Sequence, residues 1–255
     1  MARGRAGHAY SVVAAAVTVA LAITVALLTA GTPAVGAHPY TVRVMPLGDS
    51  ITWGQGSPTR SGYRKPLWDL VTGRQSRYTV DFVGSQRNGD LPDPANEGHR
   101  GWTIDGVRSR LDGWLAAYRP EVVLLHLGIN DLLHHHDPAH APERLAALVD
   151  RIYADRPGVS VVYMGLLPNT VRQRAQTTAF NRKAAALEGT ERRRGRAFWY
   201  VAPPRLGHPD MADGVHPDDA GYRKMAAVFF PALNSAVRDR MRRLAPASAS
   251  AAPPL

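Results

Sequence analysis

The sequence predicts an α/β protein with a single doubly wound, mostly parallel sheet of five strands. Short apolar segments rich in β-branched and aromatic residues alternate along the chain with longer segments of helical periodicity. The chain has 255 residues, of which 45% are hydrophobic, and this is enough for one sizeable core. No segment repeats at a period of about 20 to 50 residues, which argues against a solenoid.

Five segments have the length and composition of buried strands. They are TVRVMPL (41–47), YTVDFVG (78–84), EVVLLHLG (121–128), VSVVYMGLL (159–167) and RAFWYVA (196–202). The segments between and after them have helical spacing, and the expected helices are 63–73, 104–118, 143–154, 178–187 and 219–240. This alternation predicts helices on both faces of the sheet and a site beyond the carboxyl ends of the strands.

The first 37 residues differ from the rest of the chain. Arg3 and Arg5 precede an uncharged segment over 11–30, and small residues lead up to Ala37. This is the order of a secretory signal peptide cleaved after Ala37, although an uncharged segment of this length can also remain as a membrane anchor. Both interpretations place the rest of the chain outside the cytoplasm, and cleavage makes the protein secreted. The expected organisation is a signal peptide over 1–37, one catalytic domain over 38–244 and a disordered, low-complexity tail over 245–255.

Charge and cysteine content exclude several classes of protein. The formal net charge is +10, and removal of residues 1–37 leaves 29 − 21, or +8. A basic exported protein could adhere to anionic polymers, but the arginines are spread along the chain and no nucleic-acid-binding motif accompanies them. The densest cluster, ERRRGR at 191–196, is expected to form a solvated connection between a helix and a strand. The absence of cysteine excludes disulfides, thiolate metal sites and a cysteine nucleophile.

Residues of reactive types lie directly after the predicted strands or before the last helix. Ser50 follows the first strand, Asn130 follows the third, and Asp213 and His216 lie in the segment ADGVHPDDAGY. A serine hydroxyl needs a neighbouring base, which His216 can supply, and Asp213 can orient that histidine and stabilise its charged form. The backbone N–H of Ser50, the N–H of a glycine such as Gly101 and the Asn130 amide would stabilise an oxyanion.

The segments GDSIT, EGHRGWTID, GIND and DGVH occur in this order and resemble the SGNH hydrolases, also called GDSL-type esterases. The resemblance covers about residues 41–235. It implies a flavodoxin-like three-layer α/β/α sandwich and a serine esterase that needs neither a metal nor an organic cofactor. The serine does not lie in a GxSxG turn, which disfavours an α/β-hydrolase.

The same resemblance assigns the site residues. The family's four namesake residues correspond to Ser50, Gly101, Asn130 and His216, and Asp213 completes the triad. Gly98 could supply the oxyanion N–H in place of Gly101, but the spacing to Asn130 and the Trp-Thr pair after Gly101 favour Gly101.

Within the family, VMPLGDSITWG, DFVGSQRNG and DMADGVHPDDAGYRKMA resemble the branch that contains carbohydrate esterase family 3 and the acetylxylan esterases. This implies deacetylation of an O-acetylated polysaccharide, xylan above others, through an acyl-enzyme. A lipolytic esterase or lysophospholipase on the same fold is the first alternative, and a non-catalytic cell-wall-binding protein is the second. We expect a monomer with an ester substrate, no nucleic-acid partner and no stable membrane association once processed.

Several other residues have two interpretations each. Trp53 and Trp102 could stack on sugar rings, line an acyl pocket or only pack against the core. Asp49 is expected to order the loop around Ser50 through hydrogen bonds to backbone N–H groups, and His126 is expected to be a hydrogen-bonded core residue. A histidine cluster lacks the ligand spacing of a known metal site, so we expect no metal there; it consists of His134, His135, His136 and His140.

Overall fold

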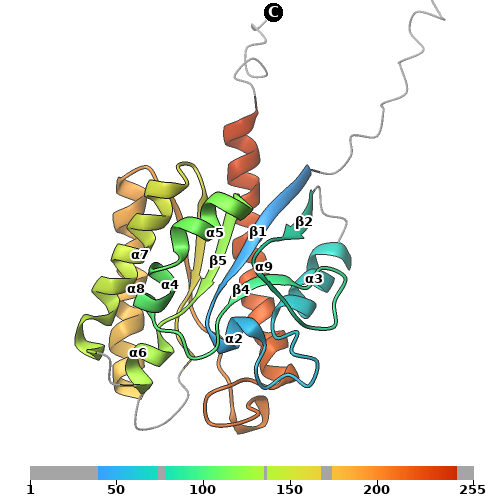
Figure 1. Ribbon diagram of the computed structural model, residues 1–255, viewed down its shortest axis with the longest axis vertical. Helices are drawn as coiled ribbons and strands as arrows, with labels where there is room; N and C mark the ends of the chain where they lie inside the picture. The colour runs from blue at the N-terminus through green and yellow to red at the C-terminus, as the bar shows by residue number, and fades with distance from the viewer. Residues whose placement is uncertain (1–39, 74–77, 135–136, 168–173, 246–255) are drawn as a thin grey trace, which may run out of the picture. The chain divides into compact units, whose positions relative to one another are not determined.

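The computed structural model describes residues 40–73, 78–134, 137–167 and 174–245 (Figure 1). The expected signal peptide and nearly all of the expected tail lie outside these ranges, as do His135 and His136. None of the helices within the described ranges is both long and apolar enough to cross a membrane.

The described residues form a seven-stranded sheet. The strands are β1 (Tyr40–Gly48), β2 (Tyr78–Phe82), β3 (Gln86–Arg87), β4 (Ala95–Gly98), β5 (Val122–His126), β6 (Ser160–Met164) and β7 (Ala197–Val201). All neighbours are parallel except β3 and β4. The five predicted strands are therefore present, but the predicted count of five was too low. β3 and β4 have two and four residues and a polar composition, so they carry no strand pattern that the sequence could show.

The five longer strands lie in the spatial order β2-β1-β5-β6-β7, which is the flavodoxin-like order 2-1-3-4-5. β2 pairs with the first half of β1, and β4 pairs with its last two residues on the same side. In such a sheet the crevice for ligands lies beyond the carboxyl ends of the strands where the order reverses, here β1 and β5.

Helices cover both faces of this sheet, as the sequence predicted (Figure 1). The helices are α2 (Ser50–Trp53), α3 (Arg64–Gly73), α4 (Ile104–Arg108), α5 (Leu111–Tyr118), α6 (Ile129–Leu133), α7 (Ala141–Asp155), α8 (Arg174–Arg193) and α9 (Asp219–Leu244). The predicted helix over 104–118 is broken into α4 and α5 at Ser109, whose hydroxyl donates to the carbonyl of Gly106. The predicted connection over 191–196 is partly wrong, because α8 continues to Arg193 and Glu191 is buried.

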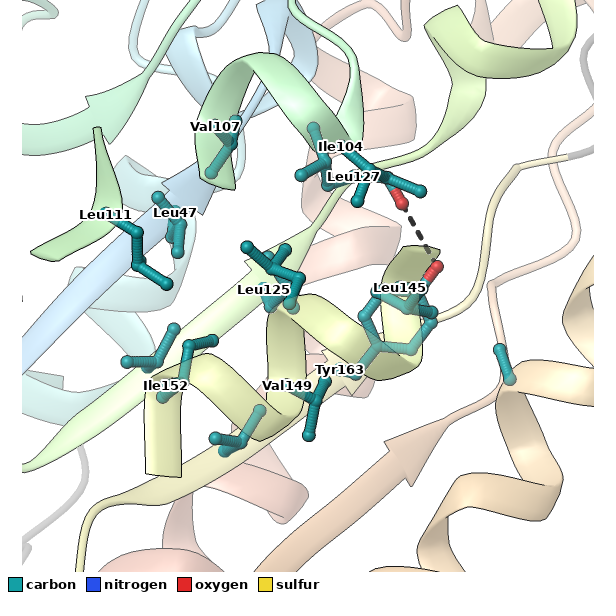
Figure 2. Packing of buried hydrophobic residues seen from close by; sticks show 14 of the residues in the cluster. Leu47, Ile104, Val107, Leu111, Leu125, Leu127, Leu145, Val149, Ile152 and Tyr163 are labelled. Atoms are coloured by element: carbon teal, nitrogen blue, oxygen red, sulfur yellow. Dashed lines mark hydrogen bonds between the residues drawn. The ribbon is translucent and has the colours of Figure 1, made fainter. Parts of the chain in front are cut away.

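Alternate residues of the strands point to opposite faces of the sheet and pack into two separate hydrophobic cores. Each core is covered by helices, and this gives the three layers. Val42 and Val44 of β1 belong to the cluster under α3 and α9, whereas Met45 and Leu47 belong to the cluster under α4, α5, α7 and α8. Figure 2 shows the second cluster, where the Tyr163 hydroxyl donates a hydrogen bond to the Leu127 carbonyl at 3.2 Å. The three-layer α/β/α sandwich is confirmed.

Candidate active site

The end of β1 presents Ser50 at the carboxyl edge of the sheet. A Cβ added at Gly48 would lie 2.1 Å from the backbone oxygen of His126, so β1 and β5 approach here more closely than a side chain allows. Asp49 is the N-cap of α2, and its Oδ1 accepts from the N–H of Ile51 at 3.0 Å, as the sequence predicted. Ser50 is the first residue of α2, where a backbone N–H has no acceptor within the helix.

Ser50, His216 and Asp213 form a continuous chain of hydrogen bonds. Ser50 Oγ lies 2.9 Å from His216 Nε2, and His216 Nδ1 lies 2.8 Å from Asp213 Oδ2. Asp213 Oδ1 also accepts from the backbone N–H groups of Val215 and His216, each at 2.7 Å. Partial burial raises the pKa of the Asp213 carboxyl, but the hydrogen bonds from His216 and Val215 outweigh it and the net pKa is lowered. The carboxylate is thus held ionised beside the imidazole.

Two loops that are distant in sequence bring this chain together. The loop of His216 is closed by an isolated bridge between Met211 and Pro217 and by a hydrogen bond from the N–H of Ala212 to the His216 carbonyl. Gly56 lies against it with φ +94°, and a Cβ there would lie 2.3 Å from the Pro217 oxygen. Glycine at this position therefore lets the loop after α2 pack directly on the histidine loop.

The structure distinguishes the two glycines that the sequence left as oxyanion candidates. The N–H of Gly98 already donates to Asn96 Oδ1 at 2.9 Å. Gly101 is exposed, has φ +77° and, within the described part of the chain, donates its N–H to no acceptor. Asn130, in the first turn of α6, donates through Nδ2 to the Trp102 carbonyl at 2.8 Å and so ties α6 to the turn that holds Gly101.

A buried carboxylate that the sequence interpretation missed anchors that turn. Glu97 accepts from the backbone N–H and hydroxyl of Ser85 at 2.7 and 2.6 Å, and its Oε1 lies 2.6 Å from His99 Nε2. The His99 ring packs against both Trp102 and Trp114, whose centroids lie 4.4 and 4.6 Å from it and 5.9 Å from each other. Trp102 thus packs against the core, whereas Trp53 lies under the guanidinium groups of two arginines.

Arg64 is a second residue whose role the sequence did not reveal. Its guanidinium is fully buried and donates to the backbone carbonyls of Thr52, Trp53, Arg60, Asn88 and Pro94. Burial lowers its pKa to about 10, so the group still carries its charge at neutral pH. It joins the segment after Ser50 to the segment before β4, and no sequence pattern marks an arginine that binds only carbonyls.

Two buried titratable groups beside the site lack partners. The prediction that His126 is hydrogen-bonded is wrong, because neither ring nitrogen has a partner among the described residues. Burial lowers the pKa of His126 to about 4, so its ring is neutral. Asp49 Oδ2 also lacks a partner in this part of the chain, and burial raises the pKa of that carboxyl to about 7.

The described residues contain no group of three or more His, Cys, Asp or Glu side chains arranged to hold a metal ion. Of the histidine cluster, His140 pairs with Asp137 at 3.0 Å on the surface.

A doubly wound sheet that presents a Ser-His-Asp chain at the carboxyl ends of its strands defines a class of serine hydrolases. Residues 47–224, well over half of the chain, match the GDSL-like Lipase/Acylhydrolase family. The chain belongs to this family, which is the SGNH family of the sequence resemblance, and it is a carboxylic ester hydrolase.

Similar proteins include carbohydrate esterases. The chain is 27% identical over 238 residues to a multidomain esterase of Ruminococcus flavefaciens, covering 82% of this chain but only 30% of that protein. A family 3 carbohydrate esterase of Clostridium thermocellum is similar in structure, with a TM-score of 0.69, 32% identity and coverage of 81% of this chain and 100% of the other. An acetyl esterase has a TM-score of 0.65 and 27% identity, with coverage of 78% and 99%.

Proposed function

We propose that Ser50 is the nucleophile of this esterase, with His216 as its general base and Asp213 as the residue that orients the histidine. The observation that carries the proposal is the unbroken hydrogen-bond chain from Ser50 Oγ through His216 to Asp213. His216 Nε2 takes the hydroxyl proton as Oγ attacks the ester carbonyl, and then returns that proton to the leaving alcohol. Water hydrolyses the resulting acyl-enzyme by the same steps in reverse order.

The oxyanion formed in each step would be bound by three donors. They are the backbone N–H of Ser50, the backbone N–H of Gly101 and Nδ2 of Asn130. The first two have no acceptor within the described chain, and Asn130 is held in place by its bond to Trp102. Donors fixed before the reaction lower the barrier because they need no reorganisation as charge develops.

The favoured substrate is an O-acetylated polysaccharide, with xylan first, acted on outside the cell by a monomeric catalytic domain over 38–244. The similarity to a family 3 carbohydrate esterase and to an acetyl esterase supports this choice. The side chains beside the triad also support it, since Gln55 and Arg100 are polar and solvent-accessible and would suit a sugar better than an acyl chain.

Acetate release from acetylated xylan by the chain without residues 1–37 tests this function. Ser50→Ala should lower the rate by about 10⁴-fold, and Ser235→Ala, an exposed serine on α9, should leave it unchanged. Hydrolysis of p-nitrophenyl esters without acetate release from xylan would move the substrate towards lipids or other small esters. Activity retained by Ser50→Ala would overturn the proposed nucleophile.

A further inference from the structure

Two arginines flank the indole of Trp53 at the opening of the proposed active site. The guanidinium carbon of Arg60 lies 5.4 Å from the Trp53 ring centroid, and that of Arg100 lies 5.1 Å from it. Both arginines are exposed, and Trp53 is partly exposed. Trp53 is the last residue of α2, the one-turn helix that Ser50 begins, so it lies one helical turn from the proposed nucleophile.

Arg100 is linked by a hydrogen bond to a residue beside the triad. Its Nε donates to Gln55 Oε1 at 2.8 Å, and Gln55 Nε2 lies 3.5 Å from His216 Nδ1 without donating to it, because Nδ1 is paired with Asp213. The hydroxyl of Tyr222 donates to the Gln55 carbonyl, which fixes this residue from the other side. Arg100 also directly precedes Gly101, the proposed oxyanion donor.

No carboxylate in the described part of the chain neutralises Arg60 or Arg100. Neither forms an ion pair there, and the two terminal nitrogens of Arg100 make no hydrogen bond there. The Asp213 carboxylate is hydrogen-bonded to His216, and the Glu97 carboxylate is buried against Ser85 and His99. Both guanidinium groups lie over the same indole, 5.4 and 5.1 Å from its centroid, so an anion bound beside this ring would be attracted by both charges.

We infer that Arg60, Trp53 and Arg100 form a subsite for a carboxylate-bearing sugar, so that the preferred substrate is an O-acetylated polysaccharide containing uronic acid. The inference rests on the proposed function and narrows its substrate class. An indole edge packs well against a pyranose ring, and a guanidinium with free terminal N–H groups donates two hydrogen bonds to a carboxylate in a bidentate pair. A neutral sugar would use the ring but leave both charges unpaired.

The test compares two polymers acetylated to the same degree, glucuronoxylan and its carboxyl-reduced form. The unmutated chain is expected to deacetylate the acidic polymer with about a tenfold higher kcat/KM at low ionic strength. The preference should shrink in about 0.5 M NaCl, because exposed charges are screened over a few ångströms at that concentration. Equal kcat/KM on both polymers at low salt would overturn the inference and leave the proposed function intact.

Substitutions assign the preference to these residues. The double variant Arg60→Gln with Arg100→Gln should bring the ratio of kcat/KM between the two polymers to about one. Arg182→Gln, on an exposed arginine of α8, should keep the tenfold ratio. A double variant that keeps the ratio would overturn the assignment. Hydrolysis of p-nitrophenyl acetate with no release from either polymer would refute the polysaccharide substrate itself, and the subsite with it.

Discussion

Charged groups at the amino-terminal ends of the parallel strands, one edge of the sheet, are paired differently from those at the carboxyl-terminal ends, the opposite edge. At the amino-terminal edge, Glu121 precedes β5 and accepts from the Arg43 backbone N–H, the Tyr40 hydroxyl and the Arg240 guanidinium. Glu191 forms ion pairs with Arg194 and Arg196, which lie just before β7. The donors to Glu121 come from β1 and α9, so this carboxylate joins segments that are far apart in sequence, whereas the donors to Glu191 lie in the connection directly after it.

The carboxyl-terminal edge leaves polar groups without protein partners. Within the described chain these include the N–H groups of Ser50 and Gly101, the guanidinium termini of Arg100, one oxygen of Asp49 and both ring nitrogens of His126. Unsatisfied polar groups cost stability, and most buried ones in proteins have partners. The amino-terminal edge also has such an atom, Arg156 Nε before β6, so the contrast lies in the exposed N–H of Gly101 and the termini of Arg100, which are open to solvent at the carboxyl-terminal edge. Four substitutions test this contrast.

The largest effect is expected from removing the charge that orients the histidine. Asp213→Asn should lower kcat on an acetyl ester by about 10⁴-fold, because an amide no longer fixes the imidazole tautomer or stabilises its charged form. The far-ultraviolet circular dichroism spectrum should not change, since Asp213 is half exposed in a surface loop. Asp219→Asn, on the first residue of α9, is the matched control and should keep full activity. A loss below tenfold for Asp213→Asn would exclude it from the triad.

The buried carboxyl of Asp49, whose Oδ2 has no partner in the described chain, should make stability depend on pH. Its pKa is raised from 3.8 to about 7 in the folded state, so the folded protein holds this proton more tightly than the unfolded chain does. The contribution of Asp49 to stability is therefore constant below pH 4, falls as the pH rises from 4 to 7, and stays low above 7. Asp49→Asn removes this titration and should gain about 4 kcal/mol relative to the unmutated protein across that interval. Urea unfolding at pH 4, 5.5, 7 and 8 measures the difference, and parallel pH profiles would refute the assignment.

Removing one oxyanion donor should have a somewhat smaller effect. Asn130→Ala should lower kcat by about 10²- to 10³-fold, which corresponds to about 3 kcal/mol of transition-state stabilisation. KM should change little, because the donor acts mainly on charge that develops during the reaction. Steady-state kinetics on p-nitrophenyl acetate separate the two parameters. An effect confined to KM would show that Asn130 binds the substrate and does not stabilise the oxyanion.

The smallest effect is expected from a substitution of Glu121, at the amino-terminal edge of the sheet. Burial raises the pKa of Glu121, but hydrogen bonds from Tyr40 and Arg43 and the charge of Arg240 outweigh it, and the net pKa is lowered. Its ionised form therefore stabilises the fold above the unfolded pKa, and this contribution is lost as the pH falls through the folded pKa. Glu121→Gln should cost about 1 to 2 kcal/mol in urea unfolding at pH 7 and leave kcat unchanged. A change in kcat would show that the two edges are coupled.

Much of the fold was predictable because its signals are local. The five longer strands are runs of buried residues, such as VVLLH in β5, and their periodicity and length record burial directly. β3 and β4 were missed because their short, polar sequences carry no strand pattern. They are strands because β3 pairs with β4 and β4 pairs with the end of β1. The break at Ser109 was also missed, because the apolar spacing continues across it.

The candidate site likewise has features that the local sequence predicts and features that depend on the fold. Asp213 and His216 are three residues apart in one loop, so their pairing follows from local geometry, and Ser50 follows a strand that the sequence identifies. The spacing in the sequence favoured Gly101 over Gly98, but the physical difference between them needed the structure. The N–H of Gly98 is buried and already donates to the Asn96 side chain, whereas Gly101 is exposed.

The order of residues was enough to predict the layers of this protein and to place Ser50, Asp213 and His216 together at the carboxyl-terminal edge of its sheet. The folded chain was needed to show that Ser50 and His216 meet across 166 positions of sequence, that Arg64 donates to backbone carbonyls, and that Arg60 and Arg100 both lie over Trp53. The physical reason is that burial and local hydrogen bonding produce a periodic spacing of apolar residues in a sequence. A contact between distant side chains depends on how loops pack, and that packing is set by the whole fold.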